Sequence, residues 1–183
     1  MAVGDIGNAV IGSLEFDTTN ASNKSVVELA TNYYAIAYAG ESDDGWLKTV
    51  KVVNNGKTIT VVDSLEFADA ASVHDVHILH IYGDIYAIFY MDVNTVKIVT
   101  VSISVLGLIS DTLVDGPDTI VAAGTLSSLD AIKVASGMFA MVYNRSGNGG
   151  TVSSIAITNA GAIGAALTDT LLFDTVISSK FRI

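Results

Sequence analysis

The sequence predicts an all-β, β-propeller-like fold built from four-stranded antiparallel blades of about 52 residues each. Three observations lead to this prediction. Half of the residues are hydrophobic, but they fall in short segments rich in Val, Ile, Thr and aromatic side chains. A unit of four such segments occurs three times along the chain. Within the segments large and small side chains alternate, as expected for sheets that are covered on both faces.

The second segment of each unit shows the repeat most clearly. Its copies are residues 33–38 (YYAIAY), 85–90 (IYAIFY) and 138–143 (MFAMVY). Their central alanines stand at positions 35, 87 and 140, in steps of 52 and 53 residues. Because neighbouring residues of a strand point to opposite faces, each blade is expected to have a bulky face and a small one. The bulky face of one blade then packs against the small face of the next.

The other three segments repeat with the same period. The first segment has copies at 25–29, 77–81 and 130–134. The third has copies at 47–52, 96–101 and 152–157. The fourth occurs four times, at 13–16 (SLEF), 64–67 (SLEF), 112–115 (TLVD) and 170–173 (TLLF). We therefore expect the chain to begin with the last strand of an earlier blade.

Glycine, asparagine and aspartate between the segments predict the turns. Asn55-Gly56 is expected to form a tight hairpin turn between the third and fourth strands, because glycine adopts positive φ without steric cost. Asp44-Gly45 is given the same role between the second and third strands. Pro117, the only proline, is expected in a loop, where its missing N–H costs no strand-to-strand hydrogen bond.

The repeat divides a single domain, 1–183, into three complete blades and one strand at either end. The expected parts are an outer strand within 1–17, blades at 25–67, 76–115 and 128–173, and an inner strand at 176–183. Propellers typically have 4–8 blades, so three blades do not close a ring. Three alternatives follow: several copies form one ring, the chain is part of a longer propeller protein, or it closes alone as a small four-bladed ring with a two-stranded last blade.

The motifs YAIAY, DGWLKTV and DSLEF, read in this order from Tyr34 to Phe67, resemble the blade repeat of uncharacterised prokaryotic β-propeller proteins. The resemblance covers nearly the whole chain and implies the propeller fold. It also implies an extracellular or cell-surface location, since such repeats recur in large surface-associated or secreted proteins. The second and third units depart from the motif, because the Asp44-Gly45-Trp46 turn is replaced by VNT at 93–95 and NGG at 148–150.

Charge and composition exclude several classes of function. The formal net charge is −10, and the nine Lys and Arg residues are scattered, so no basic surface for nucleic acid is expected. No apolar run approaches the ~20 residues of a membrane-spanning helix, so membrane insertion is not expected either. The chain has no cysteine, which rules out disulfides and thiolate metal sites. The N-terminus lacks the pattern of a signal peptide, so the protein either stays inside the cell or begins after a removed signal.

Two groups of residues are candidate ligand contacts. Trp46, the only tryptophan, follows the acidic turn that ends at Asp44, and an exposed indole there could stack on a sugar ring. The alternative is a buried Trp46 that fills a gap between blades. Glu28, His80 and Lys133 occupy one repeated position on the innermost strands, where they could form a polar ring around a central channel. The alternative there is a solvated channel wall.

We expect neither a metal site nor a cofactor. His74, His77 and His80 are close in sequence, but residues three apart on a strand point to opposite faces and do not converge on one ion. No catalytic motif is present, so a non-catalytic binding or scaffold module is the leading hypothesis. Its expected partners are further copies of the chain, and carbohydrate or a surface protein. The alternatives are a purely structural, self-assembling element without a ligand and a glycoside-hydrolase-type propeller.

Overall fold

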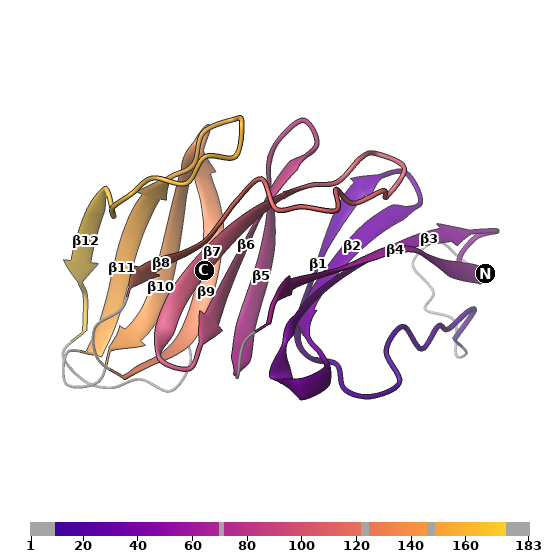
Figure 1. The fold of residues 1–183 in the computed structure, drawn as a ribbon, viewed down its shortest axis with the longest axis horizontal. Helices are drawn as coiled ribbons and strands as arrows, with labels where there is room; N and C mark the ends of the chain where they lie inside the picture. The colour runs from indigo at the N-terminus through magenta and orange to yellow at the C-terminus, as the bar shows by residue number, and fades with distance from the viewer. Residues whose placement is uncertain (1–9, 70–71, 122–124, 146–148, 175–183) are drawn as a thin grey trace, which may run out of the picture.

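The computed structural model describes residues 10–69, 72–121, 125–145 and 149–174. In these residues the chain forms three four-stranded antiparallel sheets, each in chain order from first strand to last (Figure 1). The only helical element among them is a single 3-10 turn, η1 (Glu41–Asp43). No helix in this part of the chain is long and apolar enough to cross a membrane. The predicted all-β, propeller-like architecture is confirmed.

We call the three sheets blades 1, 2 and 3. Blade 1 consists of β1 (Ser22–Ala30), β2 (Tyr33–Ala39), β3 (Gly45–Val53) and β4 (Thr58–Ala68). Blade 2 consists of β5 (Val73–Tyr82), β6 (Ile85–Asp92), β7 (Thr95–Ser102) and β8 (Asp115–Val121). Blade 3 consists of β9 (Leu126–Ala135), β10 (Met138–Arg145), β11 (Gly149–Ala156) and β12 (Asp169–Leu172). The last strand, β12, is much shorter than its counterpart β4.

The hydrophobic core lies between the blades. The small residues of β2, Ala35, Ala37 and Ala39, share one buried cluster with large residues of β6, among them Tyr86 and Tyr90. A second cluster joins the other face of β6 to β10. The predicted packing of a bulky face on a small one is therefore confirmed between blades 1 and 2. Since every blade covers its neighbour, both faces of blade 2 are buried.

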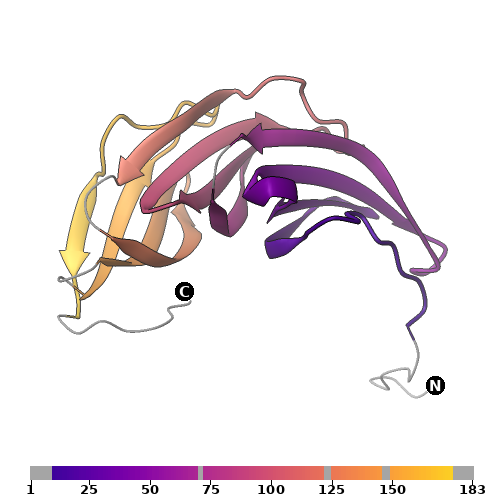
Figure 2. The ribbon, with the colours of Figure 1, turned by 60° about the horizontal axis from the view of Figure 1, so that its bottom comes forward.

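The blades follow one another along an open arc, with blades 1 and 3 at its ends (Figure 2). Their first strands lie side by side, because β5 contacts both β1 and β9. In this arrangement each innermost strand is next to that of the following blade, as in a propeller. Within the described residues the three blades form an open arc, and the outward faces of blades 1 and 3 have no neighbouring blade.

Two kinds of side-chain hydrogen bond repeat between successive blades. Threonine hydroxyls of the third strands donate to glycine carbonyls in the next blade, from Thr49 to Gly107 at 2.5 Å and from Thr100 to Gly161 at 2.7 Å. Both threonines are fully buried, so each bond satisfies a polar group that has lost its water.

Aspartates at the outer edge make the second repeated contact. The Ile109 N–H donates to Asp63 Oδ2 at 2.8 Å, and the Ile163 N–H donates to Asp115 Oδ2 at 2.8 Å. In each case the other carboxylate oxygen accepts from the N–H of the next residue. Asp169 has the same position in blade 3, opposite Ser154 as Asp63 is opposite Thr49. No described blade lies beyond it.

Replacing Asp115 by alanine is expected to lower the free energy of unfolding by about 1–3 kcal/mol, because the buried Ile163 N–H loses its partner. The same change at exposed Asp169 should cost less than about 0.5 kcal/mol in the single chain. Urea denaturation followed by circular dichroism measures both. Equal losses in the two variants would show that the contact to the next blade contributes nothing.

Several local predictions were wrong. The segment 112–115 largely precedes β8. Thr49 pairs with Asp63 in blade 1 as Thr100 pairs with Asp115 in blade 2. The residues of blade 2 that correspond to 64–67 are therefore 116–119. Pro117 therefore lies within β8 rather than in a loop. It is tolerated because β8 is an edge strand with an irregular register at this point. The third segment of blade 2 was aligned two residues too early, since Val50 and Val101 occupy equivalent positions opposite Tyr34 and Tyr86.

The turn before β3 also differs from the prediction. Residues 40–44 form a longer connection around η1, and Gly45 already belongs to β3. Gly45 is needed for packing rather than for turning, because a Cβ there would overlap the ring of Phe67. At the chain ends, 10–17 forms no strand, while 1–9 and the predicted strand 176–183 lie outside the described residues.

Candidate functional site

The outward face of blade 1 is the bulky face of its sheet. It carries Tyr34, Ile36 and Tyr38, the counterparts of Tyr86, Ile88 and Tyr90 in blade 2. The three residues of blade 2 are buried against blade 1. Of their three counterparts on blade 1, Tyr38 is fully buried, whereas Tyr34 and Ile36 are partly exposed. The outward face of blade 1 therefore has the side chains of a contact between blades, but it is only partly covered.

The segment 10–17 provides that partial cover. The Phe16 ring contacts the Tyr38 ring edge-on, with centroids 5.2 Å apart and an interplanar angle of 78°. Phe67 of β4 contacts Tyr90 of blade 2 in the same way, at 5.3 Å and 65°. Relative to blade 1, segment 10–17 thus occupies the place that β4 occupies relative to blade 2.

Gly12 supports this equivalence. It lies against the turn between β3 and β4, so closely that a Cβ on Gly12 would overlap the carbonyl oxygen of Gly56. In the motif SLEF, Gly12 precedes Ser13 as Asp63 precedes Ser64. Asp63 in turn contacts blade 2 just after the corresponding turn, at Ile109. Both ends of the segment therefore sit where an outer strand of a preceding blade would sit.

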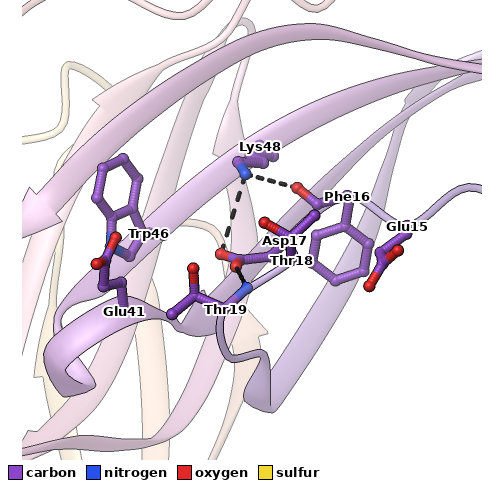
Figure 3. A pocket seen from close by; sticks show the side chains of 8 residues that line it. All are labelled: Glu15, Phe16, Asp17, Thr18, Thr19, Glu41, Trp46 and Lys48. Carbon is purple, nitrogen blue, oxygen red and sulfur yellow. Dashed lines mark hydrogen bonds and ion pairs between the residues drawn. The ribbon is translucent and has the colours of Figure 1, made fainter.

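Asp17 and Lys48 hold the segment in place (Figure 3). The Tyr38 hydroxyl donates to Asp17 Oδ2 at 2.8 Å, and the Thr19 N–H donates to Oδ1 at 2.9 Å. Lys48 Nζ donates to the Phe16 carbonyl at 2.6 Å and lies 4.0 Å from Asp17 Oδ2. The carboxylate is thus bound by a side chain of blade 1 and by its own loop.

These contacts change the acidity of both partners. Burial alone would raise the pKa of Asp17, but the hydrogen bonds from the Thr19 N–H and the Tyr38 hydroxyl, with the Lys48 charge, lower it on balance. Burial, together with the hydrogen bond to Asp17, raises the pKa of Tyr38 well above its usual range. At any pH between the lowered pKa of Asp17 and the raised pKa of Tyr38, the carboxylate is ionised and the phenol is neutral.

Acid is expected to release segment 10–17. Because the pKa of Asp17 is lower in the folded chain, its contribution is complete above the unfolded-state pKa of about 3.9 and disappears as the pH falls through the folded-state value. Fluorescence of Trp46, the only tryptophan, should report this release below about pH 4. In Asp17→Asn the same fluorescence change should already be present at neutral pH. An unchanged acid transition in that variant would contradict the assignment.

A pocket of about 260 Å³ lies beside this segment (Figure 3). Its lining residues come from the segment and its following loop, η1 and β3, and are Glu15, Phe16, Asp17, Thr18, Thr19, Glu41, Trp46 and Lys48. Trp46 is only partly buried, yet within the described residues its indole Nε1 is inaccessible and has no hydrogen-bond partner. The pocket therefore offers an aromatic ring, hydroxyls, carboxylates and one ammonium group.

Asp44 is not among the residues that line this pocket. Its carboxylate groups with those of Glu66 and Asp69, with oxygens within 4.8 Å of one another. Burial raises the pKa of Glu66, and the charges of Asp44 and Asp69 raise it further. Carboxylate oxygens are suitable ligands for a hard cation such as Ca²⁺, but two of these three residues are exposed, as acidic surface residues commonly are.

Glu28, His80 and Lys133 occupy equivalent positions on the first strands, opposite Tyr34, Tyr86 and Phe139. The structure does not bring them together as a ring of mutual contacts. His80 Nε2 pairs with the Gly83 carbonyl at 2.8 Å, and Lys133 Nζ donates to the Ile81 carbonyl of blade 2. Glu28 is exposed.

The other two histidines also have separate partners. His77 Nε2 lies 2.9 Å from the Leu129 carbonyl, and its Nδ1 lies 3.3 Å from Asp130, so it links blades 2 and 3. His74 Nδ1 lies 3.0 Å from the Ser72 carbonyl. Their observed role is in hydrogen bonding within and between blades.

The outward face of blade 3 is the small face of its sheet. Ala140 and Val142 of β10 point away from blade 2, and Ile132 and Leu171 flank them on β9 and β12. Val142 is only 5% exposed, whereas Ile132 is 40% exposed and Leu171 is 61% exposed. The two ends of the arc thus present a bulky face and a small face.

Comparisons with known proteins give fold neighbours only. No protein-family model and no curated protein sequence matches the chain. Among solved structures, it is similar to a triple arginine-to-alanine mutant of AofleA from Arthrobotrys oligospora, with 12% identity and a TM-score of 0.49, over 80% of this chain and 42% of that one. It is also similar to an alpha-L-arabinofuranosidase from Lactobacillus brevis, with 8% identity and a TM-score of 0.46, over 81% of this chain and 51% of that one. The chain spans about half the length of these structures or less.

Proposed function

We propose that the chain is a non-catalytic propeller segment that joins to further copies of itself end to end. Blade 3 of one copy packs against blade 1 of the next, and the closed ring that results is a scaffold that presents its loops to partners. One observation carries the proposal. The two outward faces are the two halves of the contact that already joins blades 1 and 2 within the chain.

The shapes and side chains of the two ends support this contact. Ala140 on blade 3 is the counterpart of Ala35, which is buried beneath blade 2. Tyr34 on blade 1 is the counterpart of Tyr86, which is buried beneath blade 1. Two copies supply six blades, which lies within the usual range of closed propellers. Because the two faces differ, successive copies associate head to tail, and the assembly leaves no face unpaired only when it forms a ring.

Burial of apolar surface favours association. Repulsion between the chains opposes it, because each chain carries a formal charge of −10. Salt screens that repulsion and leaves the apolar contact intact, so added sodium chloride should strengthen the association. A contact held mainly by ion pairs would weaken instead.

The test is the mass in solution, measured by light scattering after size-exclusion chromatography. A discrete multiple of the 19.0 kDa chain is expected, with two copies as the smallest closed ring. Ile36→Lys alters the face of blade 1, and Ile132→Lys alters the face of blade 3. Each variant alone should be a monomer. Leu106→Lys, at a 58% exposed turn residue away from both faces, is the control and should assemble normally.

Mixing the two face variants separates this proposal from other modes of self-association. Each retains one intact face, so an equimolar mixture should form a single junction and give an open pair. Two copies that met through identical faces would not be rescued by mixing. A wild-type chain that remains monomeric at all concentrations would overturn the proposal.

The pocket beside Trp46 favours carbohydrate as a second candidate ligand. An indole ring with hydroxyls and carboxylates nearby suits a sugar, whose apolar face stacks on the ring while its hydroxyls make hydrogen bonds. Since Trp46 is the only tryptophan, a bound sugar should change the intrinsic fluorescence directly. A glycan array identifies the sugar, and Trp46→Ala should abolish binding where Trp46→Phe retains part of it. If no glycan on the array binds, the remaining proposal is a purely structural ring.

A further inference from the structure

We propose that each junction between copies is completed by strand exchange. Segment 10–17 of one copy pairs with β11 of a second copy. It becomes the outer strand of blade 3 in the second copy, where it replaces β12 of that copy. This inference rests on the proposed end-to-end association and specifies how the contact is made. Its ligand is a second copy of the chain, which contributes a strand to a blade that is incomplete without it.

The first step of the argument is the space on blade 1. Within the chain, the outer strand of one blade lies on the next blade, and Phe67 of β4 reaches Tyr90. On the outward face of blade 1 the corresponding place, next to Tyr38, is already filled by Phe16. A blade 3 that docked here in the usual way would bring β12 into the same space. Segment 10–17 and β12 therefore compete for one position.

The second step is that β12 is the weaker competitor. It has four residues, all exposed, whereas β4 has eleven and β8 has seven. Segment 10–17 is held by the Tyr38–Asp17 hydrogen bond, by Lys48 and by the Phe16–Tyr38 contact. Among the described residues it is in no strand, so its backbone has not been committed to another sheet.

The third step is the match of sequence and register. SLEF at 13–16 is identical to SLEF at 64–67 in β4, while the segment that it would replace reads TLLF at 170–173. In blade 1 Leu65 lies opposite Leu47, and in blade 3 Leu171 lies opposite Val152. After exchange, Leu14 would lie opposite Val152 of the other copy.

A pair of engineered cysteines tests that register. The chain has no cysteine of its own, so Leu14→Cys with Val152→Cys adds the only two thiols. Directly opposed residues on antiparallel strands have Cβ atoms about 4.5–5.5 Å apart, near the separation that a disulfide bridges. Within one copy, segment 10–17 lies against blade 1 and β11 belongs to blade 3, and these two blades are at opposite ends of the arc (Figure 2). Mild oxidation should therefore link one copy covalently to another, whereas an equimolar mixture of the two single variants should give only one link for each pair.

A second variant locks β12 in place. Val152→Cys with Leu171→Cys joins residues that already lie opposite each other in blade 3. Its oxidised form should lose the assembly, and the reduced form of the same protein should regain it. This comparison uses one sequence, so a failure to fold is visible in the reduced sample.

The outcomes separate the two proposals. A monomeric wild-type chain overturns both of them. A wild-type ring that persists when β12 is locked, together with no link between positions 14 and 152, overturns strand exchange and leaves end-to-end association in place. Loss of the ring on oxidation of the locked variant, with a link between positions 14 and 152, supports both.

Discussion

Replacing Phe139 by alanine is expected to lower the free energy of unfolding by about 3–5 kcal/mol. The Phe139 ring is fully buried between blades 2 and 3, and its centroid lies 5.8 Å from that of Phe89. Truncation removes the apolar surface that the ring buries and leaves a cavity between two sheets, which cannot close without moving a whole blade. The variant should therefore lose much of the stability of blade 3.

Tyr34→Ala is the matched control. Tyr34 stands at the same position of the repeat, but on the outward face of blade 1, where it is only partly buried. Its loss should cost less than about 1.5 kcal/mol in the single chain. Urea denaturation followed by far-ultraviolet circular dichroism measures both variants. If the two losses were equal, the contact between blades 2 and 3 would not be a principal source of stability.

Trp46 adds a local readout to the same experiment. It lies in blade 1, two blades away from the change at Phe139. In repeat architectures each unit contacts only its neighbours, so a distant unit responds less than the total signal does. The fluorescence midpoint of Phe139→Ala should thus fall less than its circular dichroism midpoint. Coincident midpoints would show that the three blades unfold as one cooperative unit.

The packing of the blades could be predicted from sequence because it depends on a period of two along single strands. The alternation of Tyr34 with Ala35 fixes which residues share a face, and neither turn geometry nor strand order alters it. Ala35 and Ala37 are accordingly fully buried in the structure, beneath large residues of blade 2.

The outer strands were predicted less well, because their pairing depends on connections of unequal length. A short turn at 54–57 joins β3 to β4, whereas β7 reaches β8 only after an isolated bridge between Ile103 and Ile109. Aligning Leu65 of SLEF with Leu113 of TLVD gave one register for the outer strands. The structure has a different register, in which Asp63 corresponds to Asp115. Asp63 and Asp115, bound to the following blade in the same way, are the better markers.

The surroundings of Trp46 show the same limit. The sequence singled out Trp46 for its residue type. It offered no comparable reason to choose Lys48, although Lys48 belongs to the DGWLKTV motif, or Asp17, which directly follows SLEF. Both gain their role from the return of segment 10–17 across blade 1, a contact between residues 21 or more positions apart. The repeated SLEF motif was the available signal, since Phe16 contacts Tyr38 as Phe67 contacts Tyr90.

Gly161→Ala is expected to lower the free energy of unfolding by about 2–4 kcal/mol, through two separate effects. Gly161 has φ of +92°, a conformation that costs any residue with a Cβ about 1–2 kcal/mol. A Cβ there would also lie 2.8 Å from Val114 Cγ1 and 3.1 Å from Ile85 Cγ2, both in blade 2 or its connection. The turn would have to shift away from blade 2, which would also weaken the hydrogen bond from Thr100 to the Gly161 carbonyl.

Gly56→Ala separates the two effects. Gly56 has a similar φ of +84°, but nothing lies within 4 Å of the position of its Cβ. This variant should lose only the backbone contribution, about 1–2 kcal/mol. The difference between the two variants in urea denaturation therefore measures the contact of one blade's turn with the preceding blade. Equal losses would mean that the turn at Gly161 accommodates a methyl group without moving away from blade 2.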